Sequence, residues 1–516
     1  MDYLTPLSLL LFTIFLFFIL GLCKWDTSRS PSRSGRLPPS PTAFPILGHL
    51  HLLTDKPHHT FTRLAHQLGP LIYLRLGRVP TVVVSSAHLA RLVLKTHDHI
   101  FASRPQLVGP RYLSFGCSDV TYSTYGPYWR QVRKICVSEL LTSKRVNSFQ
   151  LVRDEEVDRM LSSVLTQSGS EVDLRKLFST LTNDILCRVA FGRRFTTEEG
   201  PIGKLVRAFE GSEALFAGFC VGDYFPEWKW VNSVSGLNRK LEKGMKELRE
   251  ACNEIIDEHM NNNNNNNNNG SDSTRREDFV DVLLRVHRRQ DLEVPITDDN
   301  LKALMLDMFV AGTDTTSNAL EWTMTELARN PRVLKKAQEE VRKVASHTEK
   351  VDETHLQHLR YIKALVKEAM RLHPPVPLLI PRESMEECNL DGYEIPAKTR
   401  VLINAYAIGR DPQSWEDPLV YSPERFEDDS NIDVKDQEYN FLPFGGGRRG
   451  CPGSAFGLAT LEIALARLLF HFDWELPQGV GPQDVDTDES FGLVTFKKSA
   501  LVLVPITNKS YEFKGM

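Results

Sequence analysis

A lone cysteine in a glycine-rich segment is the residue of this sequence best suited to bind a metal. Residues 444–453 contain five glycines around Cys451, and a helix is predicted directly afterwards, over residues 455–470. The backbone N–H groups of such a loop, together with the helix N-terminus, are expected to lower the pKa of the thiol. No second Cys or His lies nearby, which argues against zinc, whereas a single thiolate suits haem iron. A glycine loop that holds an incidental buried cysteine is the alternative.

A second candidate group lies in the middle of a long predicted helix. Thr297 can cap this helix and Asn330-Pro331 ends it, which gives roughly 33 residues or about 50 Å. Its middle, residues 311–316, reads Ala-Gly-Thr-Asp-Thr-Thr, and most of these residues are poor helix formers. A conflict of this kind indicates a functional distortion of the helix, and a Ser/Thr-rich kink without a function is an equally good alternative.

The same six-residue stretch offers proton-transfer chemistry beside a flat ligand. The small side chains of Ala311 and Gly312 are expected to let such a ligand approach the backbone. Asp314 and Thr315 would supply an ionisable group and a hydroxyl at that point.

A third segment carries two opposite charges on one helix face. A helix is predicted over residues 361–372, and it ends at Pro374-Pro375. Glu368 and Arg371 are three residues apart in it, so their side chains share a face. An isolated pair of this type is usually exposed and contributes little to stability, so on its own it is assigned to the surface.

Together, these three segments resemble the cytochrome P450 family. Residues 444–453 fit the F-x-x-G-x-R-x-C-x-G signature at every fixed position, and residues 311–316 fit [A/G]-G-x-[D/E]-T-[T/S]. Glu368 and Arg371 fit E-x-x-R, while residues 129–133 and 423–426 are similar to the family's W-x-x-x-R and P-E-R-F segments. The resemblance covers residues 38–505 and implies the cytochrome P450 fold, which is mainly α with a small β region.

The resemblance also implies a haem b cofactor and a role for each matching residue. Cys451 would be the metal ligand on the proximal side of the haem, and Phe444 would shield its sulfur. Asp314 and Thr315 would be the catalytic pair that delivers protons on the opposite face. The remaining cofactor-binding residues would be Trp129, Arg133, Ala311, Gly312, Arg382, Arg449 and Gly453, of which Trp129 and the three arginines would contact the haem propionates. Glu368, Arg371 and Arg425 would form a buried charge network under the haem.

The expected substrate pocket is argued from position along the chain. Its walls are expected to be mostly apolar, which favours a lipophilic substrate. The candidate lining residues are 107–121, 216–221, Leu306, Phe309, 376–380 and 491–494. Each of them could equally be an ordinary core residue.

Electrons must come from another protein, because the sequence has no flavin or nicotinamide motif. The resemblance implies NADPH–cytochrome P450 reductase as the partner, so that NADPH acts indirectly. Arg130, Lys134 and Arg448 could form a basic docking patch, although the net charge of the chain is −4. That net charge excludes a generally basic nucleic-acid-binding protein.

The N-terminal part of the 516-residue chain predicts a membrane anchor. Residues 3–23 carry no charge and match the thickness of a bilayer. Residues 24–47 are basic and proline-rich, which predicts a hinge and places the following domain in the cytosol by the positive-inside rule. Residues 48–516 would then be a single haem-thiolate catalytic domain at the endoplasmic reticulum membrane. No other segment stands out as apolar over 18 residues, so we expect one transmembrane helix.

Other segments of the chain give simpler expectations. Residues 71–75 and 81–85 are rich in β-branched and aromatic residues, which predicts two short strands. Residues 261–269 are nine consecutive asparagines, which predicts a solvated loop between two helices. The eight cysteines are too sparse for a disulfide scaffold.

The anchor, the proline hinge and the residues at the motif positions resemble those of the membrane-bound plant cytochromes P450 that make specialised metabolites. One departure is Ser40, where the hinge of the family usually carries glycine. The main hypothesis is a monooxygenase that uses dioxygen to oxidise a terpenoid, an alkaloid or a phenylpropanoid or flavonoid. Two alternatives remain: a family member that isomerises or dehydrates its substrate without dioxygen, and a non-enzymatic haem carrier or gas sensor. The presence of Asp314 and Thr315 argues against the first of them.

Overall fold

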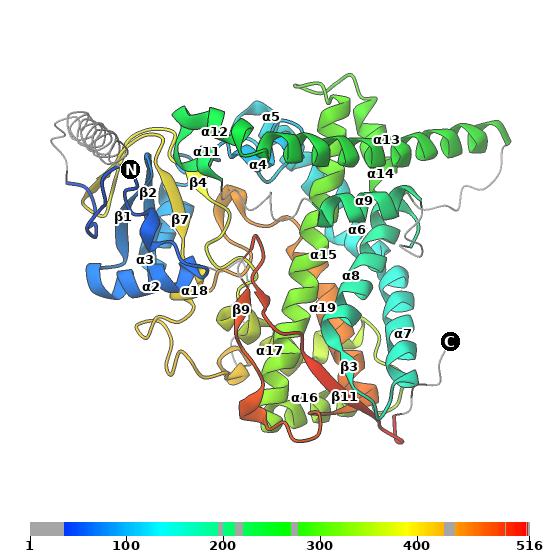
Figure 1. The fold of residues 1–516 in the computed structure, drawn as a ribbon. Coiled ribbons are helices and arrows are strands. Elements are labelled where there is room, and N and C mark those ends of the chain that lie inside the picture. The colour runs from blue at the N-terminus through cyan, green and yellow to red at the C-terminus, as the bar shows by residue number, and fades with distance from the viewer. Residues whose placement is uncertain are drawn as a thin grey trace, which may run out of the picture.

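The computed structural model describes residues 36–194, 200–211, 220–269, 277–427, 439–490, 492–511 and 513. This part of the chain is mostly helical, with a small β region, as the sequence predicts. Figure 1 shows the main sheet at one side of the molecule and most of the helices at the other, with α15 running between them.

The longer helices are α2 (Pro57–Leu68), α5 (Pro127–Ile135), α7 (Gln150–Thr166), α8 (Leu174–Phe191), α9 (Pro201–Glu210), α13 (Leu237–Asn269), α14 (Phe279–His287), α15 (Asp298–Arg329), α16 (Pro331–Val344), α17 (Arg360–Leu372) and α19 (Ser454–His471). Shorter helices are α3 (Ala87–Arg91), α4 (Val108–Leu113), α6 (Ser143–Ser148), α11 (Val221–Tyr224), α12 (Lys229–Val234) and α18 (Ala405–Ile408). The strands are β1 (Leu71–Leu76), β2 (Val79–Val84), β3 (Val172–Asp173), β4 (Arg382–Glu383), β5 (Cys388–Leu390), β6 (Tyr393–Ile395), β7 (Arg400–Ile403), β8 (Phe472–Glu475), β9 (Glu489–Ser490), β10 (Phe496–Lys497) and β11 (Val502–Thr507).

The main sheet has the strand order β1-β2-β7-β4. Strands β1 and β2 confirm the two strands that the sequence predicts, and they form an antiparallel hairpin with Leu71 opposite Val84. Strand β7, far along the chain, then pairs with β2 in parallel, and Arg400 lies opposite Thr81. The sheet therefore brings a segment from the C-terminal half of the chain against the first hairpin.

Helix α15 has the ends that its sequence predicts. The Thr297 hydroxyl accepts a hydrogen bond from the backbone N–H of Asn300, and the Asn300 side chain accepts one from the N–H of Thr297. This reciprocal capping satisfies two donors that a helix start otherwise leaves unpaired. The helix packs against α8, α17 and α19, most of its residues are buried, and many of its apolar residues belong to the largest hydrophobic core.

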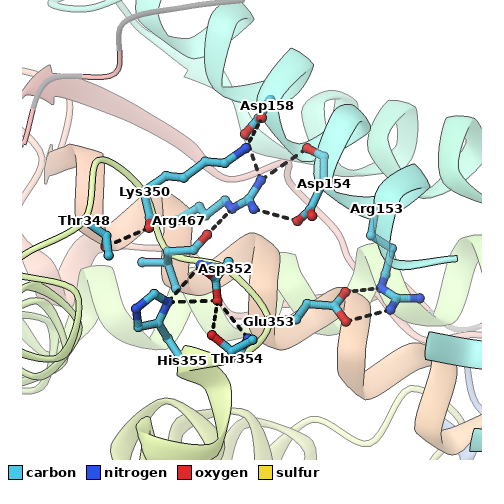
Figure 2. A network of polar contacts seen from close by, with 11 residues as sticks. Arg153, Asp154, Asp158, Thr348, Lys350, Asp352, Glu353, Thr354, His355 and Arg467 are labelled. Carbon is cyan, nitrogen blue, oxygen red and sulfur yellow. Dashed lines mark hydrogen bonds and ion pairs between the residues drawn. The ribbon is translucent and has the colours of Figure 1, made fainter. Parts of the chain in front are cut away.

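The end of α19 farthest from the Cys451 loop is fixed by a network of ion pairs (Figure 2). The fully buried Arg467 donates to the carboxylates of Asp154 and Asp158 on α7, at 2.6 and 2.8 Å. Beside it, Arg153 makes two parallel hydrogen bonds to Glu353, at 2.6 and 2.8 Å. Arg467 thus fixes the position of α19 relative to α7. The bidentate pair of Arg153 and Glu353, a geometry that fixes orientation as well as adding energy, ties α7 to the segment before α17.

The prediction of a loop over residues 261–269 is wrong, because α13 continues through all nine asparagines to Asn269. Once a helix has started, each further residue adds a backbone hydrogen bond, and asparagine disfavours a helix by less than about 1 kcal/mol per residue. The first part of α13 buries Leu241, Leu248 and Ile255, which starts the helix firmly. The polar tract therefore extends an existing helix. Figure 1 shows the end of α13 projecting away from the other helices.

The predicted anchor at residues 3–23 and most of the hinge lie outside the described residues. Among those that are described, α19 alone is long and apolar enough to cross a membrane, with a mean hydropathy of 1.3. It is 67% buried inside the protein and packs against α15, α16 and α17. We therefore interpret α19 as a core helix.

Candidate active site

The loop around Cys451 is held by its own backbone. The N–H of Cys451 donates to the carbonyl of Phe444 at 2.9 Å, which folds the segment back on itself. Gly447 has a φ of +64°, and a Cβ at this position would lie 2.3 Å from the carbonyl oxygen of Leu94. Only glycine fits both the left-handed backbone and this close approach. Glycine at this position of the sequence thus allows the loop to pack closely against residues 92–96.

The protein surroundings raise the pKa of the Cys451 thiol, contrary to the sequence-based prediction. Burial is the largest influence and disfavours the thiolate. The backbone N–H groups of Gly453 and Ser454 and the positive charge of Arg133 act in the opposite direction, as predicted, but they do not overcome it. A bound metal ion deprotonates a coordinating thiol outright, so this shift does not prevent iron ligation.

The middle of α15 is accessible, although the helix is buried on both sides of it. Residues 301–309 and 316–328 are buried, whereas Ala311 is exposed and Asp314 and Thr315 are partly exposed. The Cys451 side chain lies deep in the protein, and it also borders open space. A Cβ on Gly457, near the start of α19, would lie 3.7 Å from the Thr316 hydroxyl of α15, so the segment after Cys451 lies against the middle of α15. We infer that the two accessible regions border one internal cavity.

Within this accessible stretch the helix is not interrupted, so the expected distortion does not break it. The Thr315 hydroxyl donates to the carbonyl of Ala311 at 2.7 Å, and the buried Thr313 hydroxyl donates to that of Phe309 at 3.0 Å. Such bonds satisfy the threonines inside a helix.

Gly312 has a packing role that the sequence did not indicate. A Cβ on Gly312 would lie 3.0 Å from a methyl group of Leu186 on α8. Its small size therefore permits close packing of α15 against α8. Its neighbour Ala311 is exposed.

Arg449 is buried against Trp129 and donates only to carbonyl groups. Its guanidinium lies 4.1 Å from the centre of the Trp129 ring and donates to the carbonyls of Ala102, Val120 and Ser123, at 2.6–3.0 Å. The Trp129 indole also donates to the carbonyl of Val120, at 3.0 Å. The two predicted cofactor-binding residues therefore meet at one peptide group.

Arg133 and Arg382 also lie at the loop that carries Cys451. Arg133 donates to the carbonyl of Gly450 at 2.5 Å. Arg382 donates to the carbonyl of Gly446 at 2.7 Å and pairs with Asp98 at 3.1 Å. Of the four predicted propionate contacts, Arg449 belongs to the cysteine loop, and Arg133 and Arg382 bond to carbonyls of that loop.

A fourth buried arginine, Arg104, was missed by the sequence-based reasoning because no motif marks it. It is 5% exposed and donates to the carbonyls of Thr121, Ile380 and Pro381. Burial and the nearby charges of Arg449 and Arg382 hold its pKa well below the usual value.

The buried arginines fit a cofactor that carries carboxylates. Burial, together with the charges of Arg382 and Arg133, lowers the pKa of Arg449 to about 9. Among the described residues, no carboxylate forms an ion pair with Arg449 or Arg104. Such a surplus of buried positive charge is unfavourable unless an anion is bound. The two propionates of haem are anions of the required kind, and Cys451 is a suitable iron ligand beside them.

The charge network of the E-x-x-R segment is buried, as the resemblance implies. It does not lie at the surface, where the pair on its own was expected. Arg371 donates to both carboxylate oxygens of Glu368, at 2.7 and 2.8 Å, and both side chains are fully buried. Arg425 reaches the same carboxylate at 3.3 Å. Arg371 further donates to the carbonyls of Gly409 and Pro418. The pair thus joins α17 to the segment before Arg425.

Two buried carboxylates near the cavity were not anticipated from the sequence. Asp307 on α15 accepts hydrogen bonds from the N–H of Val120 at 2.5 Å and from the Thr121 hydroxyl at 2.8 Å. Asp119, in the same loop, accepts one from the N–H of Tyr122 at 3.0 Å. Burial raises the pKa of Asp307 to about 6, and burial and the charge of Asp307 raise that of Asp119. Asp307 therefore ties α15 to the loop that supports Arg449.

The expected pocket lining is found only in part. Leu107 and residues 376–380 line a pocket together with Gly492 and Leu493. Phe309 instead packs against the rings of Phe191 and Phe209, at 6.2 and 6.1 Å, and Leu306 is buried in the helical core. Residues 216–219 and Phe491 lie outside the described residues.

Comparisons with known proteins agree with this geometry. Residues 38–504 match the sequence model of the cytochrome P450 family. The chain is 53% identical to tryptamine 5-hydroxylase from Oryza sativa subsp. japonica, over 99% of this chain and 98% of the relative. It is 44% identical to premnaspirodiene oxygenase from Hyoscyamus muticus, over 98% of both chains.

Solved structures show the same fold. A zebrafish cytochrome P450 with abiraterone superposes with a TM-score of 0.74 and 25% identity, over 88% of this chain and 100% of that chain. The same kind of protein with progesterone gives a TM-score of 0.75 at 26% identity, over 88% and 99%. The chain therefore belongs to the cytochrome P450 family and is a haem-thiolate monooxygenase.

Proposed function

We propose that this protein hydroxylates a lipophilic specialised metabolite of a plant in the cavity between Cys451 and the middle of α15. The observation that carries the proposal is that Ala311, Asp314 and Thr315 are accessible in the middle of a helix that is buried on both sides of them, over residues 301–309 and 316–328. When bound, haem supplies the activation of dioxygen. Curated relatives with hydroxylase and oxygenase names support this function over an isomerase, a dehydratase or a haem carrier.

In this proposal the residues of the chain have separate tasks. Cys451 holds the iron, and Phe444, whose carbonyl accepts from the Cys451 N–H, packs beside it. Trp129, Arg133, Arg382 and Arg449 bind the propionates, with Arg104 as a further buried positive charge. Gly453 keeps the chain next to Cys451 free of a side chain: a Cβ there would lie 4.0 Å from the sulfur.

Asp314 and Thr315 would supply protons to the oxygen chemistry that haem provides when bound. The Thr315 hydroxyl, held by the carbonyl of Ala311, is accessible to water in the cavity and would be the proton donor. Asp314 lies one residue away on the same accessible stretch and is positioned to replace that proton. Ala311 leaves the space in which the oxygen and the substrate meet.

A redox partner delivers the electrons, and we propose NADPH–cytochrome P450 reductase. The proposed docking surface is the side that carries Arg130, Lys134 and Arg448, all of which are exposed. Arg448 is partly neutralised by Asp98, at 2.9 Å. The other two cations remain available for an acidic partner surface.

The protein is proposed to be anchored in the endoplasmic reticulum membrane by residues 3–23, with residues 24–47 as hinge and residues 48–516 as a cytosolic catalytic domain. Large apolar side chains are exposed where the hinge joins the body and on helices α11 and α12. They are Phe44, Leu47, Val221, Trp230 and Val234, of which Val234 is 79% exposed. The backbone N–H of Gly77 bonds to Leu47, and that of Arg78 bonds to Tyr224, so the two apolar groups are neighbours. An apolar patch of this kind suits contact with lipid.

The proton-delivery role is tested by Thr315→Ala, with Thr313→Ala as its matched control. Both threonines make the same hydrogen bond to the helix backbone, but only Thr315 is accessible. Thr315→Ala is expected to keep its haem and to oxidise NADPH while releasing most of the electrons as hydrogen peroxide. Product, NADPH and peroxide are measured in the same reaction with reductase. Unchanged coupling in Thr315→Ala, or equal uncoupling in both variants, would contradict the assignment.

The substrate is identified by incubating membranes that contain this protein and reductase with a plant metabolite extract, with and without NADPH. Since one relative is a tryptamine 5-hydroxylase, tryptamine is the first single compound to test. Consumption that depends on NADPH, on reductase and on Cys451 supports the proposal. If Cys451→Ala retained the activity, iron ligation by this residue would be wrong.

A further inference from the structure

One group of side chains that the proposed function does not use lies where α2 meets β9. His58 and His59 are the second and third residues of α2, and Glu489 is the first residue of β9. The Nε2 atoms of the two imidazoles lie 2.8 and 3.0 Å from the same carboxylate oxygen, Oε2 of Glu489. The fold thus brings together three potential metal ligands from distant parts of the chain.

These three side chains form a donor set that suits zinc. Imidazole nitrogen and carboxylate oxygen are both common zinc ligands, whereas calcium and magnesium ions prefer oxygen alone. The ligand atoms of the three residues all lie within 4.8 Å of one another. Around tetrahedral zinc, with bonds of about 2.0–2.1 Å, neighbouring ligand atoms lie about 3.3 Å apart. Small rotations of the side chains would therefore be enough to place a zinc ion between them.

The two imidazoles are held by contacts other than those to Glu489. The carbonyl of His58 accepts hydrogen bonds from the Thr62 hydroxyl at 2.7 Å and from the Asn404 side chain at 3.1 Å. The ring of Tyr406 packs against both imidazoles, with 4.8 and 4.6 Å between the ring centres. Because these contacts fix the backbone and the rings, much of the order that a metal site needs exists before an ion binds.

A metal ion can reach this group from solvent. The side chain of His59 is 42% exposed. Glu489 lines an open pocket with a volume of about 540 Å³, and Lys56 and Pro57, which directly precede the two histidines, line the same pocket. The pocket has room for a water molecule as the fourth ligand, as in zinc sites with three protein ligands.

The positive charges beside this group have other contacts. Lys56 and Lys498 both pair with Asp488, at 2.5 and 3.3 Å. The guanidinium of Arg410 lies 3.7 Å from the centre of an aromatic ring. Among the described residues, no lysine or arginine forms an ion pair with Glu489, so its negative charge is directed at the two imidazoles.

We propose that His58, His59 and Glu489 bind a zinc ion and thereby join α2 to the β9–β10 hairpin. Zinc would replace the two hydrogen bonds: each imidazole would bind through Nε2 and carry its proton on Nδ1, and Glu489 would bind through Oε2. Gly492 and Leu493, which line the apolar pocket with residues 376–380, belong to the connection between β9 and β10. The ion would therefore hold in place the hairpin that carries part of that pocket wall.

The test counts zinc in the full-length holoenzyme, purified without a histidine tag and freed of weakly bound metal with a chelator. The protein is dialysed at pH 7.5, at which imidazole is mostly neutral, against a series of buffered free zinc concentrations. Zinc and haem iron are then counted by elemental mass spectrometry. Because the chain also contains other histidines and eight cysteines, the measured quantity is the difference between the wild type and the variants. The wild type is expected to hold one zinc ion per haem more than His59→Ala, and magnesium in about a hundredfold excess is not expected to displace it.

His59→Ala and Glu489→Gln each remove one ligand. Both are expected to raise the zinc concentration for half-saturation about tenfold or more, since loss of a group that only supports a metal ligand already costs about 10–100-fold. His66→Ala is the matched control, because His66 is exposed on the same helix, and it is expected to bind zinc like the wild type.

Each variant is first checked for an unchanged haem absorbance spectrum. If Glu489→Gln fails this check, the partly exposed His59 still decides the test. Equal zinc in the wild type and His59→Ala, equal loss in His66→Ala, or displacement by magnesium would overturn the proposal and leave only a hydrogen-bonded group at this position.

Discussion

At the scale of single residues, the backbone of Val120 connects the two halves of the active site. Its N–H donates to Asp307 on α15, and its carbonyl accepts from Arg449 and from the Trp129 indole. A change at Asp307 is therefore felt at Arg449 through the backbone of one residue. The positions of the proposed haem contacts depend on residues that do not touch haem.

Two substitutions of Asp307 separate the contribution of its hydrogen bonds to stability from the contribution of its charge. Asp307→Ala leaves the N–H of Val120 buried and unpaired, with an expected loss of about 1–3 kcal/mol in the free energy of unfolding. Asp307→Asn keeps an acceptor for that N–H and is expected to stay within about 1 kcal/mol of the wild type. Denaturant unfolding followed by haem absorbance gives both values. An alanine variant as stable as the asparagine variant would show that these bonds do not hold the loop.

The ionisation of Asp307 is expected to make the free energy of unfolding depend on pH, in a direction that its raised pKa fixes. Burial raises the pKa of Asp307 to about 6, above the value near 3.9 in an unfolded chain. The folded state therefore binds the proton more tightly, so the contribution of this group to stability is greatest at low pH and falls as the pH rises from about 4 to about 6. Asp307→Asn is expected to remove this part of the pH dependence, measured as the difference between the two unfolding curves. Parallel curves over this range would contradict the raised pKa.

At the scale of elements, the position of α15 is set by how closely α8 approaches it. Gly312 faces Leu186 of α8, and Thr315, one turn along, faces the cavity. A larger side chain at residue 312 would push the two helices apart and move the catalytic stretch with them. Close packing against α8 is thus a condition for the geometry of the site.

Gly312→Val tests this relation between packing and catalysis. Overpacking of a tight helix contact is expected to cost about 1–3 kcal/mol of stability and to displace Ala311 and Thr315 from their positions in the cavity. The expected result is a lower unfolding midpoint together with lower coupling of NADPH oxidation to product. The double variant Gly312→Val, Leu186→Ala provides space for the new side chain and is expected to recover part of both. If the second substitution recovered neither, the contact would not be the cause.

Sequence patterns predicted the elements whose signals are local. Thr297 and Pro331 mark the two ends of α15, and the glycines around Cys451 mark a loop that only a narrow set of backbone conformations can form. Interactions between distant segments were not predictable in this way. Asp307 and Arg104 carry no local signature, and their partners are set by how α15, residues 119–122 and residues 376–381 meet in space.

Burial was the reason for one prediction that failed in sign. The helix N-terminus and the loop N–H groups act on Cys451 as expected, but burial has the larger effect on its pKa. For Gly312, tertiary packing adds a contact with the neighbouring helix α8 that the sequence did not indicate. In both cases the residue type was informative, but part of its environment came from tertiary packing.

At the scale of the whole molecule, we predict that residues 3–23 decide where the protein is found. A variant that lacks residues 1–23 is expected to leave the integral membrane fraction while keeping its haem spectrum. The exposed apolar patch around Trp230 and Val234 is expected to retain part of the truncated protein on membranes in high salt and until mild detergent is added. Fractionation followed by haem absorbance measures both. Integral behaviour of the truncated protein would refute the anchor, whatever the patch contributes.

The close contact of Gly447 with Leu94 also has a genetic consequence. Any single-base change in a glycine codon that yields another amino acid introduces a Cβ, and here that atom would lie 2.3 Å from a backbone oxygen. Missense alleles at this codon should thus behave like null alleles, irrespective of the new residue. Plants that carry them would accumulate the unoxidised precursor, which makes this codon a natural place to look when the genotype behind a metabolite difference is sought.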